Sequence, residues 1–377
     1  MVTFDPSTLA GRDLQYLRAG LLAAGYRSET LAESLRVRGA AALMSDIARI
    51  SLICCDSLGT SPSAVLGKLF LLCAPVPMRV FGKLPRPLSQ SLHEHGLVHI
   101  DSDGQHVTGR VSITEVDEFY FLADRLFENR FGTITVTTPD DVCMPPHASS
   151  FELMKAIARG RAGSAVLDVG CGSGCLSLPL ARPAGHVTGI DTSGRAVAFA
   201  RANASLNGVP AQFEQAAWQN YDSQQRYDHI LFNTPGPSTA FDFVTAGIPR
   251  LLAPGGRAEV WLTCEVLAED GDIRGTVDRM STIEPPFDLR IMVNDRSPCS
   301  LSREAVASRR RPGHTLVVKH PAEWRAYIDS LHSRGVVEVA SIVLEITHRG
   351  TPPAREMPGQ SSPDARKRLT LPSTSSL

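Results

Sequence analysis

Three glycines stand close together in the segment Leu167-Asp168-Val169-Gly170-Cys171-Gly172-Ser173-Gly174-Cys175. Glycines at a strand-to-helix turn allow positive φ angles and let a ligand approach the backbone. The spacing is GxGxG, and Cys175 stands where a dinucleotide site has its third glycine. The carboxylate of Asp168 would repel a pyrophosphate but attract a cation. The segment therefore predicts a site for a positively charged ligand, and it lacks the glycine–lysine pattern of a P-loop.

A second acidic residue, Asp191, ends the next predicted strand, about 20 residues after the glycines. A carboxylate in this position can accept hydrogen bonds from both hydroxyls of a ribose. Asp191, Thr192 and Ser193 are also candidates for the N-cap of the helix that follows. The spacing favours the ribose role for Asp191, so we expect the ligand to contain a nucleoside.

Two further segments carry candidate catalytic residues. Asn233-Thr234-Pro235-Gly236-Pro237 follows the third predicted strand, and open α/β sheets bind ligands at such strand ends. Upstream, the run from Met144 to Glu152 contains His147, whose unperturbed pKa near 6.5 makes it a candidate base, although a structural role is the alternative. Ser149 or Ser150 is predicted to cap a helix there, leaving free N–H groups for a carboxylate.

From Ser150 to Trp261 the combined pattern resembles the class I S-adenosylmethionine (SAM) dependent methyltransferases. The resemblance implies a SAM cofactor and no metal, with Asp191 on the ribose. It places the methionine part of SAM among Asp168, Gly170, Gly172 and Gly174. The region around Ala216, Ala217 and Trp218 would line the adenine. Many members have an aspartate there for the adenine amino group, and in this sequence Trp218 is a candidate for stacking on the ring instead.

The segment after the third strand resembles the Asn-Pro-Pro-Tyr motif of methyltransferases that modify planar nitrogens. In that family the asparagine and a backbone carbonyl accept hydrogen bonds from the target nitrogen, and the aromatic ring stacks on it. Asn233 and Pro235 are retained, but Thr234 replaces the first proline and Gly236 replaces the aromatic residue. We therefore expect methyl transfer to a small molecule, such as an amino acid, an amine or a natural-product intermediate.

Two alternatives stay open at this stage. A SAM-cleaving cyclase that releases methylthioadenosine needs no stacked acceptor, and the aromatic cluster Phe119, Tyr120, Phe121, Phe127 and Phe131 could stabilise a sulfonium. Most of that cluster is otherwise expected in the core. A DNA-binding regulator is the other alternative. The helix predicted at Leu88 to His95 contains no lysine or arginine for phosphate contacts, so we expect no nucleic-acid partner.

The elements that would position these residues alternate between strands and helices. Strands are predicted at 165–167, 186–190, 229–232 and 257–262, and helices at 176–181 and 195–206. Such alternation is typical of a parallel, Rossmann-like α/β sheet with helices on both faces. Further strands are predicted at 290–293, 314–318 and 336–347, with a helix at 321–333.

The N-terminal part of the chain is predicted to form a helical and winged-helix-like domain, called the front domain below. Helices are predicted at 14–24, 28–36, 40–51, 64–72 and 88–95, followed by a hairpin over 97–111. This order of domains also resembles methyltransferase-like proteins related to the release-factor glutamine methyltransferases. We predict a front domain over 1–112, a catalytic domain over 113–348 and a disordered tail over 349–377. The front domain would shape the substrate site or mediate a homodimer.

Composition restricts the class of protein. The 377 residues are 43% hydrophobic and 20% charged, with a net charge of −1, which provides no bulk attraction to nucleic acid or to an anionic membrane. The longest apolar stretches are far shorter than the ~20 residues of a membrane span. Eight cysteines occur without CxxC spacing, as expected for buried thiols in a reducing compartment. A cytoplasmic protein is the expectation.

Overall fold

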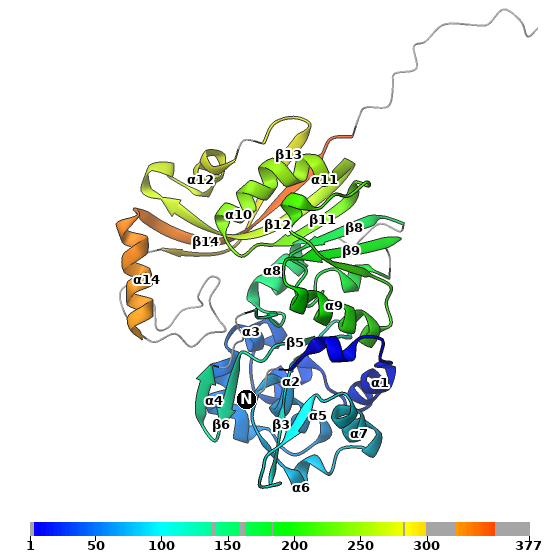
Figure 1. Ribbon diagram of the computed structural model, residues 1–377. Coiled ribbons are helices and arrows are strands. Elements are labelled where there is room, and N and C mark those ends of the chain that lie inside the picture. Colours follow the sequence, from blue (N-terminus) through cyan, green and yellow to red (C-terminus); the bar gives the residue numbers. More distant parts are fainter. Residues whose placement is uncertain are drawn as a thin grey trace, which may run out of the picture.

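The computed structural model describes residues 4–136, 141–157, 163–182, 184–281, 283–298 and 321–350. A small helical module from the first third of the chain packs against a larger part built around one sheet (Figure 1). The predicted strand at 314–318 and residues 351–377 of the predicted tail lie outside the described residues. Among the described helices, none combines the length and the apolar character that crossing a bilayer demands.

The central sheet has seven strands in the order β10-β9-β8-β11-β12-β14-β13. The first five are parallel. Four of them, β8, β9, β11 and β12, were predicted as parallel strands, and β10 was not predicted. β14 runs antiparallel to both β12 and β13. β14 begins directly after a helix, and Val336 pairs with Leu267 at the end of β12, so the chain enters the sheet from that side. The strands are β8 (Ala165–Val169), β9 (His186–Asp191), β10 (Gln212–Gln215), β11 (Tyr227–Asn233), β12 (Leu252–Leu267), β13 (Phe287–Pro298) and β14 (Val336–His348).

Helices cover both faces of the sheet, as the alternation predicted. Side chains alternate between the faces along each strand. Val166 joins a cluster that includes Leu153 of α8 (Ala148–Ala156) and Val197 of α9 (Gly194–Asn207). Its neighbour Leu167 faces the opposite layer, which consists of α10 (Pro237–Asp242), α11 (Ile248–Leu251) and α12 (Ile273–Met280). The predicted helix at 321–333 is α14 (Pro321–Ser333).

One predicted helix of the catalytic part did not form. Residues 176–181, expected to be helical, contain only the short 3-10 helix Leu178–Leu180. Pro179 lies inside this segment and has no N–H to donate to a helical hydrogen bond. The glycine loop is therefore followed by a compact turn, and the first full helix after it is α9.

The front module contains the helices and the hairpin that were predicted. Asp13 accepts a hydrogen bond from the N–H of Gln15 at the start of the first long helix, and Gly25 has a φ of +66° just beyond its end. The helix predicted at 40–51 is divided in two at Asp46. The elements are η1 (Pro6–Leu9), α1 (Gln15–Ala23), α2 (Ser28–Ser34), α3 (Gly39–Ser45), α4 (Ile47–Cys54), η2 (Cys55–Ser57), α5 (Pro62–Leu66), η3 (Gly67–Leu71), β1 (Val76–Pro77), α6 (Met78–Phe81), α7 (Arg86–Glu94), β2 (Val98–Ile100) and β3 (His106–Gly109).

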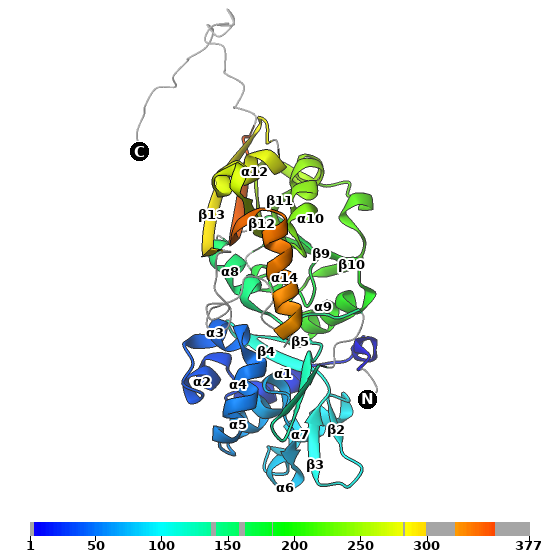
Figure 2. The same cartoon turned by 90° about the vertical axis from the view of Figure 1, so that its left-hand side faces the viewer.

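The three short strands β1, β3 and β2 form one antiparallel sheet beside α7 (Figure 2). The assignment to a winged-helix type stays a prediction, as do the domain boundaries. Two further hairpins connect this module to the large sheet. They consist of β4 (Ser112–Val116) with β5 (Phe119–Ala123), and β6 (Phe127–Arg130) with β7 (Thr133–Val136).

The face of α9 that points away from the sheet packs against the front module and hydrogen-bonds to β5. Phe199 and Leu206 belong to the same buried cluster as the leucines of α1 and α7. Asn203 and Asn207 stand one helical turn apart and exchange hydrogen bonds of 2.8–2.9 Å with the backbone of β5. These amides satisfy backbone groups of β5 that pair with no strand, so the front module and α9 form one continuous packed unit.

The aromatic cluster is mostly core, as expected. Phe119, Tyr120, Phe121 and Phe127 are buried, whereas Phe131 is 80% exposed at the turn between β6 and β7. Its φ is +51°, and its ring contacts His106 at a centroid distance of 5.4 Å. Phe131 therefore lies against His106 of the front module, and a role of the aromatic cluster in stabilising a sulfonium stays a prediction.

Candidate functional site

The glycine loop follows β8 and has the conformation that its residues predicted. Gly170, Gly172 and Gly174 have φ values of +63°, +52° and +77°, a region that favours glycine. A side chain at Gly174 would also approach Leu178 and Phe213 to 3.3 Å. The loop backbone is open at Gly170. These features leave room for a ligand against the backbone.

Asp168 is the most unusual ionisable group near the loop. Its side chain is completely buried, and neither carboxylate oxygen accepts a hydrogen bond from a described residue. Burial raises the pKa of Asp168 to about 7, the nearby Ser177 opposes this rise, and the charge of Asp191 adds to it. A buried acid without a partner is stabilised by a cation, so the carboxylate suits a positively charged ligand.

Asp191 lies across the loop from Asp168. Its Oδ2 accepts from the N–H of Gly172 and its Oδ1 from the N–H of Ser193, each at 2.9 Å. The capping role belongs to Ser193, whose Oγ accepts from the N–H of Ala196 at the start of α9. Each carboxylate oxygen of Asp191 keeps a lone pair for a further donor, as a ribose would require.

The segment predicted to line the adenine stands beside Asp191. The N–H of Ala216 donates to the carbonyl of Asp191 at 2.9 Å, which brings Ala217 and Trp218 to this side of the loop. The Trp218 ring packs edge-on against Phe243 at 5.2 Å, and its Nε1 is buried without a hydrogen-bond partner among the described residues. Contact of Ala217 and Trp218 with adenine stays a prediction.

Asn233 ends β11, the strand next to β8. Phe232 pairs with Val169, so Asn233 stands beside the first glycine of the loop. Its Nδ2 lies 2.9 Å from Ser149 Oγ and 3.4 Å from Ser150 Oγ, both on α8. The structure thus joins residues that are more than 80 positions apart in the sequence.

The loop after Asn233 is anchored to the adjacent strand. The N–H and the hydroxyl of Thr234 donate to the carbonyl of Trp261, at 3.1 and 2.9 Å. Thr234 therefore fixes the loop where the resembling family has its first proline. Pro235 is exposed, so the structure places it at the site without giving it a contact that defines a role.

His147 precedes α8 and contacts the same group of residues. Its Nδ1 lies 3.1 Å from the carbonyl of Pro145, and its Nε2 lies 2.9 Å from Ser149 Oγ. Burial lowers the pKa of His147, and the bond to Pro145 opposes the shift. The expectation that Ser149 or Ser150 caps this helix was wrong, because His147 occupies the N-cap and both serines lie within the first turn.

Several residues of this site were not singled out as functional from the sequence. Ser149 and Ser150 are buried and accept hydrogen bonds from Asn233. A serine near the start of a helix does not by itself predict such a contact. Trp261 pairs with Asn233 in register, so the two side chains project from the same face of the sheet. The Trp261 Nε1 donates to Glu152 Oε2 at 2.8 Å. Only strand pairing brings this indole beside Asn233, so no local motif would have revealed it.

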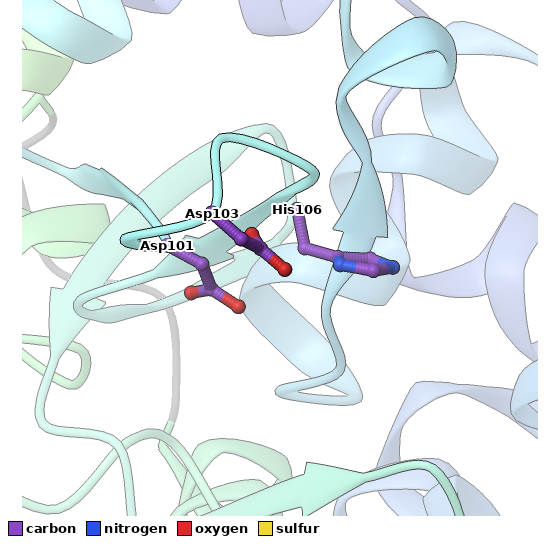
Figure 3. A group of neighbouring side chains, drawn as sticks. All are labelled: Asp101, Asp103 and His106. Carbon is purple, nitrogen blue, oxygen red and sulfur yellow. The ribbon is translucent and has the colours of Figure 1, made fainter.

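Two other features lie away from this site. A cavity of about 580 Å³ extends from Ala216 along β9 and β10 to His186, toward the strand ends opposite the glycine loop. On the hairpin of β2 and β3, ligand atoms of Asp101, Asp103 and His106 lie within 4.8 Å of one another (Figure 3). These side chains are at least partly exposed, and one Asp103 oxygen already accepts from the Gln105 N–H. We assign no metal to them.

Comparisons with known proteins relate part of this chain to methyltransferases. Residues 161–270 match the family model described as a methyltransferase domain. The ubiquinone biosynthesis O-methyltransferase of Aeromonas salmonicida is 37% identical over 156 residues, which is 39% of this chain and 60% of that protein. The release factor glutamine methyltransferase of Geobacter sulfurreducens is 35% identical over 164 residues, 36% of this chain and 56% of that protein. The chain thus spans less than two thirds of each relative.

Two solved structures have a partial likeness to this chain. A SAM-dependent methyltransferase from Thiobacillus denitrificans, in complex with S-adenosyl-L-homocysteine, is 19% identical, with a TM-score of 0.32. That match covers 53% of this chain and 91% of the other. Trm5b from Pyrococcus abyssi is 14% identical with a TM-score of 0.38, covering 67% and 62% of the two chains.

Proposed function

The chain carries a class I SAM-dependent methyltransferase domain, and from this premise we propose that it transfers the methyl group of SAM to a small molecule with an N–H or O–H group. An amino acid, an amine or a natural-product intermediate fits this description. The proposal depends on the chemistry of the two sides of the site, one for SAM and one for the acceptor.

The orientation of Asn233 is the observation that carries the proposal. Both hydrogens of its Nδ2 face serine hydroxyls on α8, at 2.9 and 3.4 Å. No described residue donates to its Oδ1, which is left to accept a hydrogen bond from an incoming N–H or O–H. Because β11 and β8 are adjacent, this oxygen and the glycine loop belong to the same end of the sheet. An acceptor held there would have its lone pair positioned beside the cofactor.

The SAM side supports the same reaction. We propose that Gly170, Gly172 and Gly174 accommodate the methionine part, that Asp168 faces its cationic groups, and that Asp191 binds the ribose. SAM supplies an electrophilic methyl carbon: the acceptor lone pair forms the new bond, the carbon–sulfur bond breaks and S-adenosylhomocysteine leaves. The chain then needs mainly to orient the acceptor and to exclude water, which together can supply most of the acceleration. We propose that the acceptor's proton leaves to solvent, because His147, the candidate base, has its Nδ1 on the Pro145 carbonyl and its Nε2 on the Ser149 hydroxyl.

A small acceptor is favoured over a macromolecule by local features. The stacking residue of the resembling motif is absent at Gly236, and the exposed Pro235 offers no planar platform. α7 begins at Arg86, two residues before the predicted start, so the expectation of a helix without lysine or arginine was wrong at that position; further along, Gln90 and Glu94 hydrogen-bond each other, and Arg86 is the one lysine or arginine in the helix. Relatives are named for quinone biosynthesis, for a release factor and for ribosomal protein L11, so both classes of acceptor occur among them. We place the reaction in the cytoplasm, where free thiols such as the buried Cys171 and Cys175 persist.

Incubation of the full chain with SAM carrying a deuterated methyl group tests the proposal. Amino acids, amines and phenols are offered in pools, and mass spectrometry follows the labelled product and S-adenosylhomocysteine. We expect labelled product in at least one pool, abolished in Asp191→Ala and retained in the control Asp278→Ala on α12. Methylthioadenosine formed without an acceptor would overturn methyl transfer and establish SAM cleavage. Labelling of a purified release factor or ribosomal protein alone would overturn the small-molecule acceptor.

A further inference from the structure

His147, Ser149 and Asn233 form a chain of hydrogen bonds whose directions can be derived. The carbonyl of Pro145 can only accept, so the Nδ1 of His147, 3.1 Å away, carries a hydrogen. In a neutral imidazole the other nitrogen then has a lone pair. The Nε2 therefore accepts from the hydroxyl of Ser149, 2.9 Å away. This fixes both the tautomer of His147 and the direction of the serine hydroxyl.

The same reasoning determines the orientation of the Asn233 amide. Because the Ser149 hydrogen points to His147, only lone pairs of its Oγ remain for Asn233, and the amide must present Nδ2 to them, as observed at 2.9 Å. The second Nδ2 hydrogen faces Ser150 Oγ at 3.4 Å. Both serines are buried, at 4% and 3% exposure, so water does not replace these partners readily. The outward direction of the Oδ1 thus depends on a neutral His147.

From this chain of hydrogen bonds we infer that His147 and Ser149 are positioning residues for Asn233, and that protonation of His147 reverses the amide and closes the acceptor site. The inference goes beyond the proposed function and rests on it only in identifying Asn233 as the acceptor-binding group. A neutral His147 keeps an oxygen toward the acceptor. A protonated His147 turns a nitrogen toward it.

Protonation acts through the hydroxyl of Ser149. When solvent supplies a proton to Nε2, this nitrogen becomes a donor to Ser149 Oγ, and the serine hydrogen must find another acceptor. Among the described residues, Ser149 Oγ contacts only His147 and Asn233. A buried hydroxyl without an acceptor costs about 1–3 kcal/mol, and rotation of the amide, which presents Oδ1 to Ser149, removes that cost. Nδ2 then faces the acceptor and repels its N–H or O–H group.

The surroundings of His147 favour the neutral form. Burial disfavours the imidazolium, and the N-terminal end of α8 adds a partial positive charge. The ionisable neighbours are engaged elsewhere: Glu152 of α8 accepts from Trp261, and Cys175 lies beyond Ser150. α3, which packs against α8, contains no titratable side chain. The sheet face beneath α8 also carries Asp168, His229, Arg257, Glu259 and Glu345. Asp168 and Glu259 both pair in register with Leu231, two residues before Asn233, and Glu259 contacts His229 and Arg257.

Nuclear magnetic resonance of the full chain tests the inference without an acceptor. With histidine and asparagine labelled by ¹⁵N, His147 is assigned by its loss in His147→Gln, and the side-chain amide of Asn233 by its loss in Asn233→Ala. We expect Nε2 to be the unprotonated nitrogen at pH 7.5 and the titration midpoint to lie below 6.5. The Asn233 amide signals should shift with the same midpoint. His99→Gln, at an exposed histidine of β2, should leave that shift unchanged.

Ser149 variants separate positioning from simple proximity. In Ser149→Ala the histidine should still titrate while the Asn233 signals no longer follow it, and Ser149→Thr, which keeps a hydroxyl, should restore the coupling. An unprotonated Nδ1, Asn233 signals that ignore the His147 titration, or the same coupling in Ser149→Ala would each overturn the inference. None of these readouts requires SAM turnover, so a failure of the proposed function would appear separately, as absent product in the acceptor screen.

Discussion

The two sides of the site differ in how their polar groups are satisfied. On the SAM side, Asp168 is buried with both oxygens lacking a hydrogen bond among the described residues. On the acceptor side, Asn233, Ser149 and His147 hydrogen-bond one another. Burial leaves the ionised form of Asp168 only partly stabilised, by Ser177, so an arriving cation would stabilise it further, whereas the paired network is already organised. The difference indicates that the ionised Asp168 destabilises the folded protein until SAM binds, and that the hydrogen bonds of the acceptor side hold Asn233 in one orientation.

The acceptor side is tested most severely by Asn233→Ala. Removal of the group proposed to orient the acceptor should lower kcat by about 10²–10³-fold, the size expected for loss of an oriented polar contact at a reacting atom. SAM affinity should change by less than about threefold, because Asn233 is proposed to contact only the acceptor. Steady-state release of S-adenosylhomocysteine and calorimetric titration with SAM measure the two quantities.

The exposed Asn294 of β13 provides a matched control, and Asn294→Ala should leave both values unchanged. Equal losses of turnover and SAM affinity in Asn233→Ala would show that the two sides are not separate.

The unpaired acid of the SAM side predicts an unusual dependence of stability on pH. The folded pKa of Asp168, about 7, exceeds the ordinary value of 3.8, so the unfolded chain loses this proton first. The contribution of Asp168 to stability is therefore fully present below pH 4 and lost as the pH rises toward 7. In the absence of SAM, Asp168→Asn should be more stable than the natural chain by about 2–4 kcal/mol at pH 8.

Urea unfolding of the two proteins at pH 4.5 and pH 8 measures this effect. At pH 4.5 the two stabilities should lie close together, because Asp168 is then protonated in the folded state and partly so in the unfolded chain. A variant that is less stable than the natural chain at pH 8 would mean that the carboxylate already has a partner.

Binding of SAM should show the opposite dependence on pH. A cationic ligand selects the ionised form of Asp168, so affinity should weaken by about tenfold between pH 7.5 and pH 6, where only about a tenth of this group is ionised. In Asp168→Asn the affinity should be lower and nearly flat over this range. Calorimetric titrations with SAM at pH 7.5 and pH 6 measure this affinity. Equal SAM affinity at both pH values in the natural chain would exclude Asp168 as the partner of the cation.

The smallest effect is expected for a substitution outside both the SAM side and the acceptor side of the site. Phe131 is exposed on the front module and contacts His106, so Phe131→Ser should leave SAM affinity within about twofold and stability within about 0.5 kcal/mol. Equilibrium binding and urea unfolding measure both. A large loss of SAM affinity would place this aromatic ring in the site and revive cleavage of SAM stabilised by cation–π contact.

The conformation of the glycine loop, on the proposed SAM side, could be predicted from the sequence because it is local. Gly170, Gly172 and Gly174 require positive φ values wherever the chain folds, and Asp168 and Asp191 flank that loop within one strand–loop–strand unit. Period-two alternation and glycine turns act over a few residues, so the strands β8, β9, β11 and β12 and the helix α9 also followed from them, whereas the short strand β10 did not. Local patterns failed at residues 176–181, where apolar spacing predicted a helix. Pro179 has no N–H for a helical hydrogen bond, and only a short 3-10 helix forms.

The acceptor side was decided by the tertiary structure. Asn233 was identified by its motif, but its direction is set by Ser149 and His147, which reach it only because α8 packs across the end of β11. Trp261 lies beside Asn233 because β11 pairs with β12. β14 runs antiparallel to β12 because α14 ends near the end of β12, where β14 begins. Sequence determines what each residue can donate or accept. Which partner it meets depends on contacts between distant segments, and these are selected by the burial of the whole core.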